Sequence, residues 1–218
     1  MNFLRIYIFL IISTLLPGNY YAQKKLSLEI STGAPFNLPL PLTIRQAGKS
    51  DINLTAHYYS KPFAIPIFWD WRLSYWNGSG GWEIEAVHHK IFLSNKPLGV
   101  DEFSISHGLN LVTINRCCFI YGFILRTGAG IVIAHPESIV NNEKLSEKRG
   151  IFNWGYYISG PVIILSAGKR VNLIDKIFIT LDAKIGCSYS YIPVSNGNAE
   201  VYNVAFMVTF GLGYDFLL

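Results

Sequence analysis

The chain has 218 residues, of which 50% are hydrophobic and 15% are aromatic, and its formal net charge is +4. This positive charge is small and scattered, so the composition does not indicate a nucleic-acid partner. Beyond the N-terminus no run of about 18 consecutive apolar residues occurs, which excludes a membrane-spanning helix. Strands remain possible, because a strand crosses a bilayer with about 9 to 11 residues of which only half need be apolar.

The N-terminus has the pattern of a secretory signal peptide. Arg5 precedes the apolar run Ile6 to Leu16, and Ala22 offers a small residue at a cleavage site. We therefore predict a signal peptide at residues 1–22, followed by one domain at residues 23–218. Earlier cleavage, or retention of the apolar run as a helical anchor, is the alternative.

Segments of alternating polarity fill the rest of the chain. The alternation is longest near the C-terminus, where Ile179 and Leu181 alternate with Thr180 and Asp182. One face of such a strand is apolar, and the other is polar, charged or small, as in a strand between lipid and a narrow lumen. Eight strands are predicted, roughly at Lys25–Gly33, Phe63–Trp76, Trp82–Ser94, Phe103–Ile114, Phe119–His135, Phe152–Gly168, Ile177–Tyr191 and Tyr202–Phe216.

These segments predict an all-β fold, an eight-stranded antiparallel up-and-down transmembrane β-barrel. A soluble sandwich or lipocalin-like barrel is the alternative, but its outward face would be polar. Here the polar face is the smaller and more glycine-rich one, which favours an outer-membrane location in a Gram-negative cell.

The predicted links alternate between short and long. Compact turns are expected at Asn77–Gly81, Asn115–Cys118 and Lys169–Lys176, and longer loops at Ala34–Pro62 and Pro136–Ile151. Bacterial barrels place short turns in the periplasm and long loops outside the cell. Both ends of the mature chain are therefore expected in the periplasm.

Charged residues occur on the polar face of several strands. An eight-stranded barrel is filled by its side chains, so we expect these charges to form a salt-bridged plug rather than an open pore. The three cysteines lack metal-ligand spacing, and the sequence predicts neither a metal site nor a cofactor. The charges expected to face the lumen are Asp70, Arg72, Glu83, Glu85, Arg126, Asp182, Lys184 and Asp215.

All five histidines fall in the predicted outward half of the barrel, as does Ser195 in the last outer turn. A histidine can accept the proton of a serine hydroxyl that attacks an acyl ester. Alternation points His89 into the lumen and puts His107 on an apolar face, unless a bulge turns it. A structural role at the membrane interface is the alternative for all five, which are His57, His88, His89, His107 and His135.

The strand pattern resembles that of the small outer-membrane barrels, and the last hairpin is similar to those of lipid A-modifying enzymes. In the lipid A deacylase family a His-x-Ser-Asn motif supplies base and nucleophile. The stretch Pro193-Val194-Ser195-Asn196 keeps the serine and asparagine but replaces the histidine with proline. The resemblance thus implies Ser195 as nucleophile beside Asn196, with His89, His107 or His135 as the base. The same hairpin also resembles the lipid A palmitoyltransferase barrel.

The sequence thus predicts an integral outer-membrane barrel that is a monomer without an open pore. We expect it to interact with outer-leaflet lipid or lipopolysaccharide. A lipid A acyl-ester hydrolase or acyltransferase is the enzymatic alternative, with Ser195, Asn196, His89 and His107 as the tentative catalytic residues. A structural or adhesive barrel is the third possibility.

Overall fold

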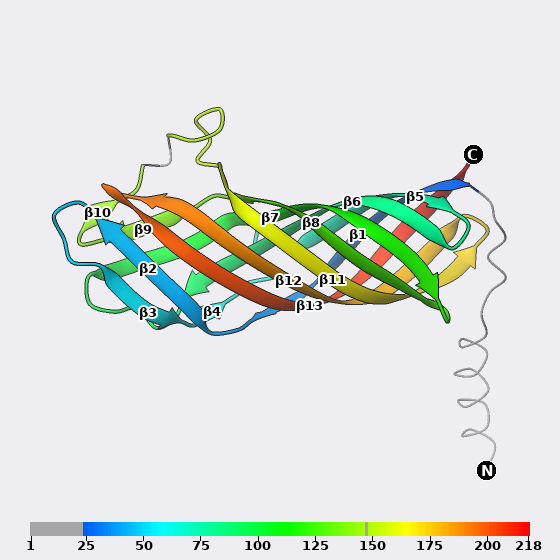
Figure 1. Cartoon of the computed structure of the whole chain (residues 1–218), viewed down its shortest axis with the longest axis horizontal. Helices are drawn as coiled ribbons and strands as arrows, with labels where there is room; N and C mark the ends of the chain where they lie inside the picture. Colours follow the sequence, from blue (N-terminus) through cyan, green and yellow to red (C-terminus); the bar gives the residue numbers. More distant parts are fainter. Residues whose placement is uncertain (1–23, 147) are drawn as a thin grey trace, which may run out of the picture.

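The computed structural model describes residues 24–146 and 148–218, so the predicted signal peptide lies outside the described residues. Eight antiparallel strands close into a ring (Figure 1), which confirms the predicted up-and-down barrel. No helix in the described ranges is long and apolar enough to span a membrane. The ring consists, in order, of β1 (Lys25–Asn37), β5 (Trp69–Asn77), β6 (Gly80–Leu93), β7 (Val100–Ile120), β8 (Phe123–Ala134), β11 (Tyr157–Ile174), β12 (Ile177–Val194) and β13 (Gly197–Leu217).

The hydrogen-bonding register sets the tilt of the strands. Following paired residues around the ring from Lys25 leads back to β1 at Pro35, ten residues farther along. For eight strands this stagger corresponds to a tilt of about 40° and to an interior that side chains can fill. Figure 1 shows the tilt, with the start of β1 and the C-terminus at the same end of the barrel.

The three links at that end are two-residue turns at 78–79, 121–122 and 175–176. Such short turns face the periplasm in bacterial barrels, so the opposite end faces the outside. The turn predicted at Asn115–Cys118 is wrong, because β7 continues to Ile120. Tyr121 and Gly122 have φ values of 50° and 82°, which suit a tight hairpin turn, whereas Asn115 is buried in the lumen.

Other predicted boundaries also shift; β1 extends beyond Gly33 to Asn37, and β13 begins at Gly197 rather than Tyr202. β5 begins at Trp69 rather than Phe63, because Pro62 and Pro66 cannot donate to a β-ladder. β11 begins at Tyr157 rather than Phe152, whose φ is 52°. The turn predicted at Lys169–Lys176 contracts to 175–176, since β11 pairs with β12 almost to its end.

At the outer end the long loops form further strands that extend the wall (Figure 1, left). The fourth outer link is a two-residue turn at 195–196, so the predicted strict alternation of short and long links fails there. β12 and β13 are themselves long, at 18 and 21 residues, and they build the outer extension without a loop. β2 pairs with β13, β4 with β6, and β9 with β7; the added strands are β2 (Leu40–Gln46), β3 (Ile52–Ala56), β4 (Tyr58–Tyr59), β9 (Glu137–Val140) and β10 (Glu143–Lys144).

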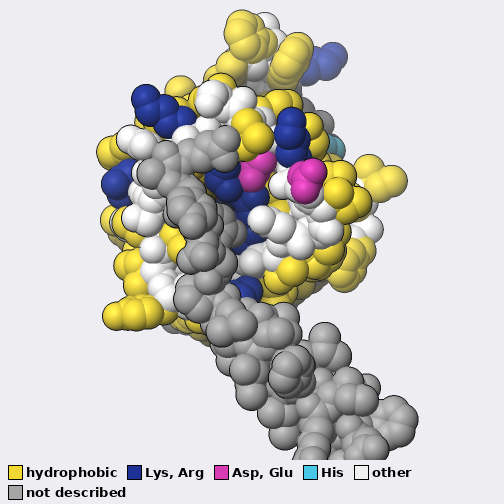
Figure 2. Space-filling view, turned by 90° about the vertical axis from the view of Figure 1, so that its right-hand side faces the viewer, with side chains coloured by type: hydrophobic (Ala, Val, Ile, Leu, Met, Phe, Trp, Pro, Cys, Tyr) yellow, Lys and Arg dark blue, Asp and Glu magenta, His cyan; other side chains and the backbone are white. Residues whose placement is uncertain are grey.

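Apolar side chains cover the outward face of the barrel. On β13, Val208, Phe210 and Leu212 are each more than half exposed, while the intervening Thr209 is buried. Seen from the inner end, Figure 2 shows hydrophobic side chains around much of the periphery, with some basic side chains among them, and further basic and acidic side chains nearer the centre. Only lipid satisfies a belt of this kind. Trp76 is not part of this belt, because it is buried and packs on Cys117 and Ile124.

Buried ion pairs fill the inner half of the lumen. Arg72 Nη2 donates to Glu29 Oε1 at 2.7 Å and to Asp182 Oδ2 at 2.8 Å. Arg126 Nη1 donates to the other oxygen of Asp182 at 2.6 Å. Each charge expected to face the lumen is buried. The network shares carboxylate oxygens between several cations, as a group of charges removed from water requires.

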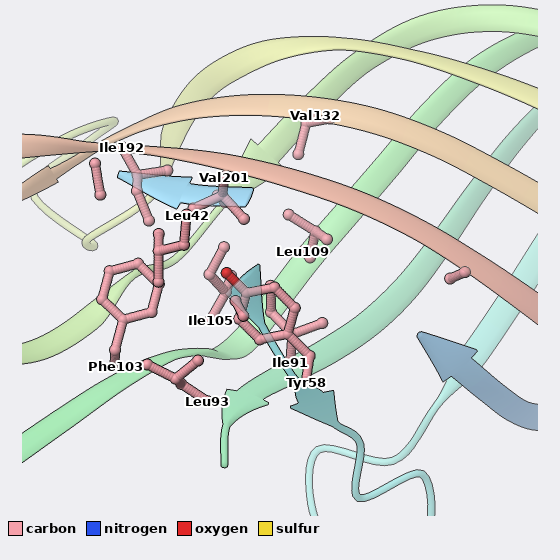
Figure 3. Packing of buried hydrophobic residues seen from close by; sticks show 14 of the residues in the cluster. Leu42, Tyr58, Ile91, Leu93, Phe103, Ile105, Leu109, Val132, Ile192 and Val201 are labelled. Carbon is pink, nitrogen blue, oxygen red and sulfur yellow. The ribbon is translucent and has the colours of Figure 1, made fainter. Parts of the chain in front are cut away.

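The outer half of the interior is apolar instead. Side chains of the ring, among them Phe103, pack there against residues of the outer strands such as Leu42 and Tyr58 (Figure 3). Tyr58 lies beside Ile91, in the space that the barrel wall surrounds. The long outer connections therefore fold back into the barrel, and a hydrophobic core lies above the ionic plug.

Candidate functional site

The structure places Ser195 and Asn196 together in the turn between β12 and β13. The Ser195 hydroxyl donates to Glu143 Oε2 at 3.2 Å, and Asn196 Nδ2 donates to the same oxygen at 2.8 Å. Gln46 Nε2 donates to the Ser195 carbonyl at 2.9 Å. These contacts attach the last hairpin to the β9–β10 hairpin. In this arrangement the serine hydroxyl donates its hydrogen bond to a carboxylate, not to an imidazole.

His89 lies inside the barrel, as its alternation predicts. It is fully buried, and its Nε2 is 2.9 Å from Asn37 Oδ1. Asn203 Nδ2 donates to the same oxygen at 2.8 Å. Because an amide oxygen only accepts, His89 Nε2 carries the hydrogen in this bond. His89 is thus held within the interior by β1 and β13.

His107 points outward because β7 bulges next to it. The pairing of β6 with β7 shifts between His89 and Ile91, and Gly108 has a φ of +130°. Phe103 and Ile105, on the same register as His107, are buried in the interior rather than facing lipid. The irregularity in β7 turns His107 to the opposite face. His107 Nδ1 contacts Glu137 Oε1 and lies 3.1 Å from the Ser106 hydroxyl. The side chain of His107 is 55% exposed.

His135 joins His107 at the same bulge. It follows β8 directly, and its backbone N–H donates to the Gly108 carbonyl at 3.0 Å. Its ring lies 4.9 Å from the His107 ring and 4.9 Å from the Tyr156 ring, centroid to centroid. Of the sequence candidates, the structure therefore brings together Ser195 with Asn196 and His107 with His135. Catalysis by Ser195 and a histidine stays a prediction.

A second feature of the outer end was not predicted from the sequence. Residues 61–67, here called the lipid-side loop, connect β4 to β5 along the outward face of the barrel. Thr32 Oγ1 donates to the Phe68 carbonyl at 3.3 Å, and Lys90 Nζ donates to the Ala64 carbonyl at 2.9 Å. Both Thr32 and Lys90 are on the outward-facing register of their strands. Phe63 and Ile65, on either side of Ala64, are 77% and 93% exposed.

Two lysines and two aromatic rings border the lipid-side loop at its outer end. Pairing of β4 with β6 brings Tyr59 against Phe92, with stacked rings 5.3 Å apart. Lys61 Nζ lies 4.8 Å from the centroid of the Phe92 ring and 5.7 Å from that of Tyr59. Lys90 is the second cation. Alternation along β6 is consistent with an outward-facing Lys90. Nothing in the sequence indicated that Lys61, which lies in the lipid-side loop, would be close to it.

The level of these lysines and aromatic rings in the membrane follows from the length of β6. A tilted strand crosses the hydrocarbon in about 9 to 11 residues, and Lys90 is the eleventh residue of β6 counted from the inner turn. The lysines are therefore at the level of the outer headgroups. The apolar loop residues next to them face the acyl chains of the outer leaflet.

The fold is similar to that of several solved structures. The chain is similar to the outer membrane protein AlkL, determined by solid-state NMR in DMPC lipid bilayers, with a TM-score of 0.50 and 12% identity over 93% of this chain and 95% of that chain. It is also similar to OprG from Pseudomonas aeruginosa, with a TM-score of 0.47 and 10% identity over 90% and 97% of the two chains. For Ail, the attachment invasion locus protein of Yersinia pestis, the TM-score is 0.40 and the identity 12% over 89% and 99%.

No protein-family model and no curated protein matches the chain. At 10% to 12% identity the likeness to solved structures concerns the fold alone. The lipid A deacylase resemblance receives no support from these comparisons. The closed ring, the apolar outer belt and the fold shared with AlkL together make this chain an integral outer-membrane β-barrel.

Proposed function

We propose that this barrel is closed to solute flow and acts at its outer surface, where the lipid-side loop binds lipopolysaccharide. The observation that carries the proposal is the pairing of exposed apolar residues with lysines at headgroup level. Phe63 and Ile65 can insert among acyl chains, and the exposed Lys61 is placed to meet an anionic headgroup. Lys90 is buried and donates to the Ala64 carbonyl, so it adds positive charge behind the loop. Phosphates of lipid A provide that negative charge in the outer leaflet.

The filled interior supports the closed state. Arg72 and Lys184 are fully buried among carboxylates in the inner half, and Tyr58 and Phe103 contribute to an apolar core in the outer half. Solute flow would require both layers to move. Placing the ligand site on the outward face leaves this interior intact.

The lysine charges give the sharpest test of lipid binding. Each lysine near an anionic surface contributes about 1 kcal/mol, so Lys61→Gln is expected to weaken lipid A binding about fivefold and Lys61→Gln with Lys90→Gln more strongly. Glutamine at position 90 can still donate to the Ala64 carbonyl and keep the loop attached. Isothermal titration of lipid A into barrel refolded in lipopolysaccharide-free detergent measures the change.

Lys96→Gln is the matched control, because Lys96 is an exposed lysine of the same outer end that lies in the 94–99 link. Its Nζ donates to the Asp101 carbonyl at 2.6 Å, away from the lipid-side loop. Lipid A affinity should be unchanged in this variant. Equal affinities for the wild type, the double variant and the control would contradict the proposal.

A further inference from the structure

We propose that His107, His135 and Glu137 form a binding site for a divalent transition-metal ion, with zinc as the ion best matched to the ligands. Each residue offers one ligand atom, and these atoms all lie within 4.8 Å of one another. The site lies at the outer end of the barrel, apart from the lipid-side loop, and it does not depend on the proposed lipid binding.

The local fold brings the three residues together. β7 pairs first with β9 and then with β8, and the break between these two pairings falls at residues 105–108 of β7 and 135–136 of the other chain segment. His107 lies on the β7 side of this break and His135 on the opposite side, and Glu137 is the first residue of β9. The hydroxyl of Tyr156 donates to the His107 carbonyl at 3.2 Å, which ties a third segment to the bulge.

The donor set suits zinc. Two imidazoles and one carboxylate, with a fourth position left for water, are ligands that zinc accepts in proteins. Zinc binds such atoms at about 2.0 to 2.2 Å, so tetrahedral ligand atoms are about 3.5 Å apart. His135 Nδ1 and Glu137 Oε1 are already 3.8 Å apart, and His107 Nδ1 contacts the same carboxylate. Small side-chain rotations therefore complete the geometry.

A second observation points independently to a ligand. The side chain of His135 is only 8% exposed, and in the described part of the chain its Nδ1 has no hydrogen-bond partner. A buried polar atom without a partner is costly, and such atoms are often explained by an ion or water. Nδ1 faces the carboxylate of Glu137 at 3.8 Å. A metal ion between them would satisfy His135 and neutralise Glu137 together.

His107 completes the access side of the site. Its side chain is 55% exposed, so an ion can enter from the extracellular solvent without any movement of the barrel wall. Bound metal would connect β7 to the start of β9 and so hold the outer extension on the bulge. This consequence concerns the outer end alone, because the ring strands below are already closed by hydrogen bonds.

The test uses full-length mature barrel without a polyhistidine tag, refolded in lipopolysaccharide-free detergent and stripped with EDTA. Titration with Zn²⁺ should give about one ion per chain in the wild type. His107→Ala and Glu137→Gln should each weaken binding on the order of tenfold or more. Visible absorption of the Co²⁺-loaded protein should show the strong bands of a four-coordinate site and lose them in both variants.

His57→Ala is the control, since His57 is exposed at the same end but lies between β3 and β4, outside the cluster. Zinc binding should be unchanged in this variant, and heat-modifiable migration should show that all variants are folded. No zinc binding by the wild type, or binding that survives either His107→Ala or Glu137→Gln, would overturn the proposal. In that case the three residues form an ordinary histidine–carboxylate ion pair at the rim.

Discussion

Replacing Arg72 with leucine is expected to destabilise the folded barrel by about 3 to 5 kcal/mol, because it leaves buried carboxylates without their shared cation. Arg72 is fully buried, and one of its nitrogens donates to both Glu29 and Asp182. Removing one partner is strongly destabilising because it leaves a buried charge uncompensated, even where the complete network is no more stable than apolar packing. Urea unfolding in lipid vesicles, followed by tryptophan fluorescence, measures the free energy of unfolding.

Arg45→Leu provides the comparison for Arg72. Arg45 also pairs with two carboxylates, those of Asp51 and Glu200, but its side chain is 43% exposed. Solvent screens such a pair, so the free energy of unfolding should fall far less than for Arg72→Leu. If both variants lose equally little, the ion pairs of the lumen do not hold the barrel closed.

Val208→Arg is expected to lower the free energy of unfolding by about 2 to 4 kcal/mol. The cause is a charge placed in lipid rather than a lost ion pair. Val208 is 59% exposed on the lipid-facing side and pairs with Ala34 and Ala183 near the middle of the belt. A charge there must leave water for hydrocarbon. The folded fraction in a urea series, read from heat-modifiable migration, should fall at lower urea than in the wild type.

Leu98→Arg introduces the same charge outside the belt. Leu98 is fully exposed in the short link between β6 and β7 at the outer end. Its substitution should leave the folded fraction close to that of the wild type. A Val208→Arg barrel as stable as Leu98→Arg would mean that this face does not contact lipid.

Period-two alternation was sufficient to predict the barrel wall and the contents of its inner half. Asp182 and Lys184 alternate with Leu181 and Ala183 on one strand, and the structure buries the first pair and exposes Leu181. Alternation is a local property, so it survives errors in the ends of strands. The turn near Asn115 was misplaced because asparagine favours turns, and here its amide instead donates to Glu83 and Glu85 in the lumen.

The candidate sites were harder to predict because they depend on irregular pairing. A bulge in β7 turns His107 outward and brings it close to His135. Apart from Gly108, no residue in the sequence indicates where this bulge lies. The pairing of Tyr59 with Phe92 places the start of the lipid-side loop, and with it Lys61, at the outward face. The path of this loop cannot be predicted from the sequence. Ser195 is within the predicted outer turn, but its partner Glu143 comes from a hairpin that the sequence indicated only as a loop.

Binding of lipid A to the wild-type barrel, with and without its phosphates, tests the central claim most directly. Native mass spectrometry of the refolded protein in detergent separates the free barrel from the barrel with one bound lipid. The proposal assigns charge recognition to Lys61, assisted by Lys90, so phosphorylated lipid A should occupy the barrel at concentrations where the dephosphorylated lipid does not. Equal occupancy by the two lipids, or no bound lipid with either, would contradict lipopolysaccharide recognition at the lipid-side loop.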